Sequence, residues 1–338
     1  MQTPVDLQVC IAIGIRNEGG KMGRNVCIIG GSGFVGRAII QEAIRHGHEI
    51  TVACRHPERA RDLAVEGVRM LRADVVDGRG LDEAVAGADT VIYLVGLLFE
   101  KGRYNFEAAH VHGVEHVLAA CKRAGVKHYL HMSALGAGQI PASKYARSKG
   151  EAEGFVRQSG LNWTIFRPSI IYGAGDNFFN QFKKMSKSLP ILPVISGETR
   201  FQPVWVQDVA RAFVSSIGNK HVSGRAFELG GPKVYSFKAL LELLMSELQR
   251  NRLLVPVPQF VARIMATFMQ FLPTPPLTPD QLVLLRHDNV VEGEAFPKEF
   301  GKPAELEVVL PSYICATPME ALQQQLNTSR SYYRKGGI

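Results

Sequence analysis

Three residues in the middle of the chain have side chains that could perform acid–base chemistry together. Tyr145 and Lys149 are four residues apart, which places both on one face of a helix, and Ser133 ends an apolar run twelve residues before Tyr145. A lysine charge can lower the pKa of a nearby phenol and hold a nicotinamide ribose, while a serine hydroxyl can orient a carbonyl or an alcohol. We therefore predict a site for oxidation or reduction. The same residues would also suit a site that only grips the ribose.

A glycine-rich segment near the start of the chain has the spacing of a dinucleotide-binding turn. Its glycines follow an apolar, β-branched run and precede an amphipathic stretch. Glycine permits the positive φ of a tight turn and lets a pyrophosphate approach the backbone, and the following helix offers unpaired N–H groups to phosphate. The residues predicted to bind the pyrophosphate are Gly30, Gly33, Phe34, Val35 and Gly36.

The ends of the next two predicted strands indicate which dinucleotide binds. NAD-binding folds carry an acidic residue at the end of the second strand, whereas an arginine there accommodates a 2′-phosphate. This chain has Arg55 at that position and Arg59 one turn later, so we expect NADP(H) to be favoured over NAD(H). Asp74 and Val75 end the third strand and are expected near the adenine ring.

Short β-branched runs alternate with amphipathic stretches from residue 24 onward, a pattern typical of βαβ units and a parallel sheet covered on both faces. The predicted strands are 25–30, 48–54, 68–73, 90–95, 128–132, 163–167 and 226–229, and the predicted helices include 36–46, 81–85 and 106–124. The fold class is therefore α/β: a doubly wound parallel-sheet NAD(P)-binding Rossmann fold with a smaller C-terminal α/β domain.

The pattern also divides the chain into segments. We assign 24–170 to the Rossmann domain, with a returning strand near 204–231, and both 171–200 and 232–314 to the smaller domain. Residues 1–23 are expected to be a poorly ordered extension, in which Met22 is an alternative start, and 315–338 are expected to be a tail.

Composition excludes several classes of protein. The net charge of +8 is spread evenly, since Lys and Arg exceed Asp and Glu by four in each half, which argues against nucleic-acid binding. No apolar run approaches the ~20 residues of a bilayer-spanning helix. The five cysteines contain no C-x-x-C pair, so we expect no metal site and free thiols in a reducing compartment.

With these motifs in order, the chain resembles the extended and atypical branch of the short-chain dehydrogenase/reductase superfamily. Two further segments carry this resemblance, at 167–173 and 204–210. It implies catalytic roles for Ser133, Tyr145 and Lys149 and adds Pro168 to the cofactor-binding residues.

Two departures from that branch bear on function. The segment 200–203 lacks the acidic pattern of sugar-nucleotide epimerases, which argues against a sugar-nucleotide substrate. His110 stands where extended enzymes carry an asparagine that helps build the active site, so the sequence leaves turnover open.

Within that branch the chain is most similar to the NADPH-binding accessory subunits (alpha subcomplex subunit 9 type) of respiratory complex I, in their bacterial versions. The segments that carry this similarity are 176–180, 197–204, 276–281 and 288–291, and it extends from about residue 24 to 311. It implies NADPH as a structural or regulatory ligand and complex I subunits as partners. It also implies docking at the membrane surface beside the region where quinone enters. The location would be the cytoplasm or the cytoplasmic face of a bacterial inner membrane.

The alternative is a stand-alone NADP-dependent oxidoreductase or epimerase-like enzyme, acting on a quinone precursor or an isoprenoid-like molecule.

One C-terminal stretch, 257–272, predicts a helix that is apolar on most of its circumference. Its polar positions form one narrow stripe, Gln259, Arg263, Thr267 and Gln270. A helix of this kind is either buried in the smaller domain or faces a membrane or a partner. A cluster of Lys183, Lys184 and Lys187 is either a solvated helix face or a contact for anionic headgroups.

Overall fold

The computed structural model describes residues 23–315. The predictions for 1–22, including the alternative start at Met22, and for 316–338 lie outside the described residues. The division into domains at 170 stays a prediction.

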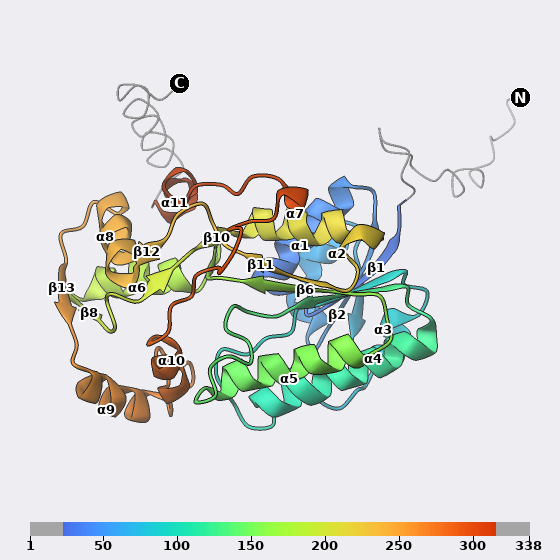
Figure 1. Ribbon diagram of the computed structural model, residues 1–338, viewed down its shortest axis with the longest axis horizontal. Helices are drawn as coiled ribbons and strands as arrows, with labels where there is room; N and C mark the ends of the chain where they lie inside the picture. The colour runs from blue at the N-terminus through green and yellow to red at the C-terminus, as the bar shows by residue number, and fades with distance from the viewer. Residues whose placement is uncertain (1–22, 316–338) are drawn as a thin grey trace, which may run out of the picture.

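A seven-stranded parallel sheet forms the centre of the molecule, with the strand order β11-β6-β5-β4-β1-β2-β3 (Figure 1). Its strands are β1 (Asn25–Ile29), β2 (Glu49–Cys54), β3 (Arg69–Arg72), β4 (Thr90–Tyr93), β5 (His128–Met132), β6 (Trp163–Pro168) and β11 (Arg225–Leu229). From β1 the chain runs outward first through β2 to β3 and then, on the other side, from β4 to β11. The order therefore reverses between β1 and β4, which opens a crevice at their carboxyl ends. The predicted doubly wound α/β fold is confirmed.

Helices cover both faces of this sheet (Figure 1). One face carries α1 (Phe34–Arg45), α2 (Arg61–Val65) and α7 (Val206–Ser216), and the other carries α3 (Leu81–Val85), α4 (Gly113–Ala124) and α5 (Lys144–Gln158). Because both faces are covered, central strands such as β4 and β5 are buried along their whole length. Short helical turns complete this half at η1 (Pro57–Arg59), η2 (Glu107–His112), η3 (Lys220–Val222) and η4 (Lys298–Phe300).

A second apolar core lies beyond the carboxyl ends of β5, β6 and β11 (Figure 1). Its rings include Tyr172, Phe179 and Phe237. The elements in this part are β7 (Ile171–Tyr172), α6 (Phe178–Ser188), β8 (Ile191–Val194), β9 (Arg200–Phe201), β10 (Val204–Trp205), β12 (Tyr235–Ser236), α8 (Phe237–Glu247), β13 (Leu253–Pro256), α9 (Gln259–Met269), α10 (Pro279–Leu284) and α11 (Leu306–Ile314).

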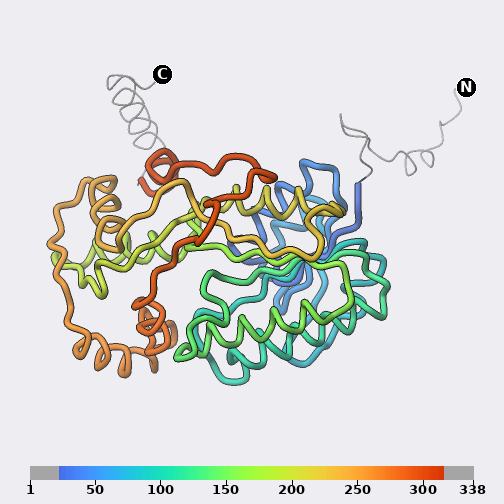
Figure 2. The backbone as a smooth tube through the Cα atoms, in the orientation of Figure 1, coloured from blue at the N-terminus to red at the C-terminus, as the bar shows by residue number. Residues whose placement is uncertain are grey.

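After α10 the chain crosses back to the sheet before it reaches α11 (Figure 2). On this path Gly230 N donates to Ala295 O at 2.7 Å. Phe296 and Phe300 then pack into the core between the sheet and α7. These two rings fall in the segment that the sequence assigned to the smaller domain. They pack into the core of the sheet because β11 is an edge strand, and the two rings cover its apolar side chain Phe227.

Helix α9 exposes its large apolar side chains. Phe260 and Phe268 are 69% and 73% exposed, Phe271 just after the helix is 81% exposed, and the buried residues of α9 are Ala262 and Ala266. The two alanines form the contact with α10 because their small side chains permit close approach, which leaves the larger side chains outside. Of the two alternatives that the sequence left open, the structure contradicts burial in the smaller domain. No helix of the described part of the chain is long and apolar enough to cross a membrane.

Candidate functional site

A cavity of about 390 Å³ opens at the carboxyl ends of β1, β2, β3 and β4, beside the point where the strand order reverses. Half of the residues predicted to bind the dinucleotide line this cavity: Gly30, Gly33, Arg55, Arg59, Asp74 and Val75. Because they come from three different strands, their convergence supports the nucleotide site that the sequence predicts.

The glycine loop fits closely against the start of α1. Gly30 has a φ of +82°, a conformation that glycine adopts without strain. A Cβ on Gly36 would lie 2.3 Å from Gly31 O, so only glycine lets the loop and the helix meet. Phe34 and Val35 occupy the first turn of α1 and do not line the cavity. Their contribution to phosphate binding would come from backbone N–H groups, which have no partner within the helix.

The outer wall of the cavity is built by Tyr104, a residue that sequence reasoning missed. Its hydroxyl donates to Asp74 Oδ2 at 2.9 Å, and Arg103 Nη2 donates to the same oxygen at 2.6 Å. The Arg55 guanidinium lies 4.2 Å from the centre of the Tyr104 ring, in a cation–π contact. No spacing in the sequence relates Tyr104 to the two strand ends that it joins.

Tyr145 and Lys149 lie on α5, as their spacing predicts, and Lys149 reaches the inner end of the cavity. Lys149 is buried, and its Nζ donates to Met132 O at 3.1 Å. The same atom would be 3.8 Å from a Cβ on Gly96, which lines the cavity. Tyr145 packs edge-on against Phe106, with ring centres 5.7 Å apart. Lys149 thus lies next to the cavity wall at Gly96, whereas Tyr145 does not line the cavity.

The pKa of Tyr145 is shifted in the direction opposite to the one that the sequence suggested. Burial lowers the pKa of Lys149 to about 8. Burial and the nearby Asp280 carboxylate raise the pKa of Tyr145 to about 12, whereas the sequence suggested that Lys149 would lower it. The phenol therefore keeps its proton at neutral pH and can act as a hydrogen-bond donor or an acid.

Ser133 lies at the end of β5, but its hydroxyl is turned toward a carboxylate. Ser133 Oγ donates to Glu153 Oε1 at 2.7 Å, and Arg167 grips both oxygens of Glu153 at 2.8 and 2.6 Å. Burial raises the pKa of Glu153, but the hydrogen bonds from Arg167 and Ser133 outweigh it, so the net shift is downward. Because an ionised carboxylate has no proton to give, the hydrogen in this bond belongs to Ser133. The spacing of Glu153, one turn beyond Lys149 on the same face of α5, is the signal that could have revealed it.

His110, the departure noted in the sequence, has a structural role. It lies in the π-helical turn η2, where its Nε2 accepts from Leu97 N at 2.9 Å. Its Nδ1 is 2.9 Å from Ser148 Oγ, which in turn donates to Tyr145 O. Burial lowers the pKa of His110 to about 2, so the ring is neutral and Nδ1 carries its proton. His110 therefore ties the loop after β4 to α5 and does not titrate near neutral pH.

Pro168 ends β6 and does not line the nucleotide cavity. Its carbonyl accepts from Leu135 N at 3.1 Å, which fixes the loop that follows Ser133. No group of three or more His, Cys, Asp or Glu residues within 23–315 could hold a metal ion.

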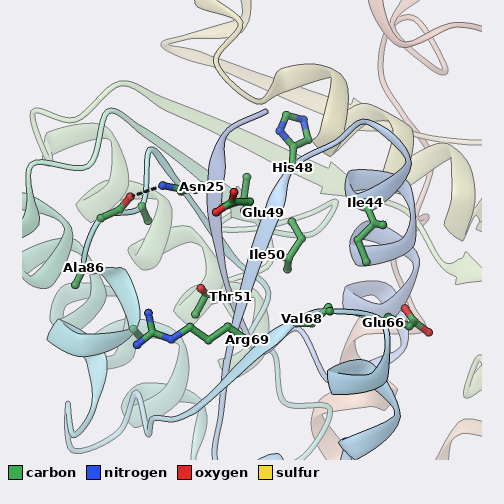
Figure 3. Close-up of a pocket in the computed structure, with 15 residues that line it drawn as sticks. Asn25, Ile44, His48, Glu49, Ile50, Thr51, Glu66, Val68, Arg69 and Ala86 are labelled. Carbon is green, nitrogen blue, oxygen red and sulfur yellow. Dashed lines mark hydrogen bonds between the residues drawn. The ribbon is translucent and has the colours of Figure 1, made fainter. Parts of the chain in front are cut away.

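A second hollow, of about 430 Å³, lies at the amino ends of β1 and β2 (Figure 3). Asn25, His48 and Glu49 lie around it (Figure 3). Ligands of open parallel sheets bind at the carboxyl ends of the strands. That is the edge of the sheet opposite to this hollow, and every predicted site residue lies there. We therefore assign no function to this hollow.

Comparison with known proteins agrees with this geometry. Residues 30–189 match the NAD(P)H-binding family, and residues 136–260 match the RmlD substrate binding domain family. The mitochondrial NADH dehydrogenase [ubiquinone] 1 alpha subcomplex subunit 9 of Arabidopsis thaliana is 32% identical over 92% of this chain and 78% of its own length. A ceramide reductase of Caulobacter vibrioides is 31% identical over 56% of this chain and 60% of its own length.

Among solved structures, an NADPH-dependent quinone oxidoreductase from Escherichia coli, complexed with NADPH, superposes with a TM-score of 0.69. It is 20% identical, and the match covers 83% of this chain and 96% of that chain. At this identity the likeness establishes a shared Rossmann-type fold.

Proposed function

Because this chain belongs to the family of the NADH dehydrogenase [ubiquinone] 1 alpha subcomplex subunit 9 proteins, we propose that it is an accessory subunit of a respiratory NADH:quinone oxidoreductase. In this proposal NADPH is a structural or regulatory ligand that holds the nucleotide-binding half in shape.

The hydrogen bond that Ser133 donates to Glu153 is the structural observation that supports this proposal. A carbonyl reductase needs a donor that polarises the carbonyl beside the tyrosine. Here the Ser133 proton is committed to Glu153, at 2.7 Å, and the carboxylate is fixed in turn by Arg167. Tyr145 and Lys149 remain suited to hold a ribose, but the third member of the catalytic set has no proton to offer.

Arg55 and Arg59 support NADPH as the preferred dinucleotide. Both line the cavity at the end of β2, and no acidic residue occupies the tip of that strand. Loss of one charge-assisted phosphate contact costs about 1.5–3 kcal/mol, or roughly 10- to 100-fold in affinity. Arg55→Ala should therefore weaken NADPH binding by that factor in calorimetric titration and leave NADH nearly unchanged. Equal losses for the two nucleotides would exclude a 2′-phosphate contact.

Helix α9 supports a location on the cytoplasmic face of the membrane. Its exposed phenylalanines have no acidic residue among them, and Arg263 adds a positive charge on the same helix. The chain as a whole carries +8, which favours an anionic lipid surface. We propose that the exposed side of α9 contacts the bilayer beside the enzyme that this subunit joins.

Mild-detergent extraction of membranes followed by native separation tests the function. We expect the protein to co-migrate with NADH:quinone oxidoreductase activity. We expect the same of Tyr145→Phe, because the ring and Lys149 still frame the ribose, and the variant should keep its NADPH. A free pool of protein with no co-migrating fraction would contradict the assignment.

The second candidate is a stand-alone NADP-dependent oxidoreductase. The observation in its favour is the Tyr145 phenol, which keeps its proton beside the buried Lys149. For an enzyme of this kind, Tyr145→Phe would lower the rate by about 10²- to 10⁴-fold. If the wild-type protein oxidises NADPH with a quinone and Tyr145→Phe does not, that result would favour the stand-alone enzyme over the accessory subunit.

A further inference from the structure

A cleft of about 320 Å³ lies beside the candidate active site, where three distant segments meet. One wall comes from the loop after β4, a second from the start of α5, and the third from α10 and the segment that precedes it. Apolar residues supply most of these walls: Phe99, Phe106, Ala142, Pro275, Pro279 and Val283. Neither the family resemblance nor the matched families assign a ligand to this cleft.

The walls are held in place by hydrogen bonds between the segments. Asp280, at the start of α10, accepts from Ser143 Oγ at 2.9 Å and from Lys144 N at 2.7 Å. Its carboxylate thus caps the amino end of α5, where the helix dipole favours negative charge. Gln281 Nε2 donates to Leu98 O at 3.4 Å, which ties α10 to the loop after β4. The cleft is therefore formed before a ligand arrives.

The charges in the lining do not favour an anionic ligand. Lys144 is the one lysine that lines the cleft, and its Nζ lies 3.9 Å from Glu100. The carboxylate of Asp280 is occupied by the N–H groups of α5. The Lys144 and Glu100 side chains are exposed at the mouth of the cleft and lie next to each other, and two aromatic rings form part of its walls, so the cleft suits an uncharged hydrocarbon group.

One end of the cleft lies next to α9 and the other lies next to Tyr145. Gln270, at its outer end, follows α9 and stands between the exposed Phe268 and Phe271. Phe106, at its inner end, is the ring that packs edge-on against Tyr145. A chain lying in the cleft would run from the exposed face of α9 toward the inner end of the nucleotide site.

We propose that this cleft binds the hydrocarbon chain of a neutral, single-chain lipid or isoprenoid, which enters past α9 and ends against Phe106. The inference rests on the proposed bilayer contact of α9 only for the route by which the chain arrives. The binding itself follows from the apolar walls and is measured without a membrane.

Calorimetric titration of the full chain with hexanol, octanol, decanol and dodecanol tests the cleft. Each buried methylene contributes about 0.8 kcal/mol, so affinity should rise about fourfold for each added carbon and level off once the cleft is full. Affinity that does not depend on chain length overturns the proposal.

Two variants locate the binding. Val283→Asp places a charge in the apolar wall and should weaken decanol binding at least about tenfold. Ala142→Trp, at an exposed position on the rim, should shorten the chain length at which affinity levels off. Because that residue is exposed, this variant keeps the test valid if Val283→Asp fails to fold. Unchanged decanol binding in a folded variant of either kind overturns the proposal.

Two control variants separate this inference from the proposed function. Val308→Asp changes an exposed apolar residue on α11 and should leave decanol binding unchanged. Phe268→Ser, which is outside the lining, should weaken membrane binding but not decanol binding. A protein that binds decanol with the expected dependence on chain length but never associates with membranes would contradict the proposed location and leave the cleft assignment intact. A protein that associates with membranes but binds decanol without the expected dependence on chain length would contradict the cleft assignment and leave the proposed location intact.

Discussion

Replacing Phe268 and Phe271 together by glutamate should release the protein from membranes without unfolding it. Both side chains are more than 70% exposed, so neither glutamate is buried by the change. Full burial of one phenylalanine side chain contributes about 1.5–3 kcal/mol, so losing two should weaken vesicle binding by at least about 100-fold.

The measurement pairs flotation on vesicles of phosphatidylethanolamine and phosphatidylglycerol with a thermal melt and an NADPH titration. Val65→Glu is the matched control, because Val65 is 89% exposed on α2, far from α9. We expect this control to float like the wild type. A double variant that floats normally would show that α9 does not contact lipid, and one that aggregates would show that α9 belongs to the core.

Glu153→Gln should lower the free energy of unfolding by about 1.5–3 kcal/mol, because it replaces the charge-assisted hydrogen bonds from Ser133 and Arg167 to a buried carboxylate by neutral ones. The side chain of Glu153 is 4% exposed and accepts from Ser133, Arg157 and Arg167. The substitution keeps the volume, so packing contributes little to the expected loss. Denaturant unfolding of the two proteins measures the difference.

The pH dependence of that difference follows from the direction of the Glu153 pKa. The folded-state pKa is lowered below its ordinary value, so the carboxylate stabilises the fold above the unfolded-state pKa of about 4.3. This contribution is lost as the pH falls through the folded-state pKa. The gap between wild type and Glu153→Gln should thus be constant near neutral pH and narrow in acid.

Glu151→Gln, on the exposed side of α5, is the control and should change stability by less than about 0.5 kcal/mol. A Glu153→Gln protein that is as stable as this control would mean that Ser133 and Arg167 do not depend on Glu153. The structural support for an inactive Ser133 would then be lost.

Local spacing determined much of this protein before any tertiary structure was known. Strand-to-helix alternation predicted the doubly wound sheet, and glycine spacing located the turn that closes on α1 at Gly36. The four-residue interval placed Tyr145 and Lys149 on one face of α5. These features depend on backbone periodicity and on the absence of a Cβ, both of which are properties of neighbouring residues.

Tertiary structure decided what those side chains can do. Ser133 ends the predicted strand, yet its proton points to Glu153, twenty residues away. Asp280, which caps α5 and raises the pKa of Tyr145, is 137 residues from Ser143. The composition of α9 allowed burial or exposure, and the close contact of Ala262 and Ala266 with α10 selected exposure. Hydrogen-bond direction, pKa and burial all depend on which distant groups pack against a residue, and spacing along the chain carries no record of those neighbours.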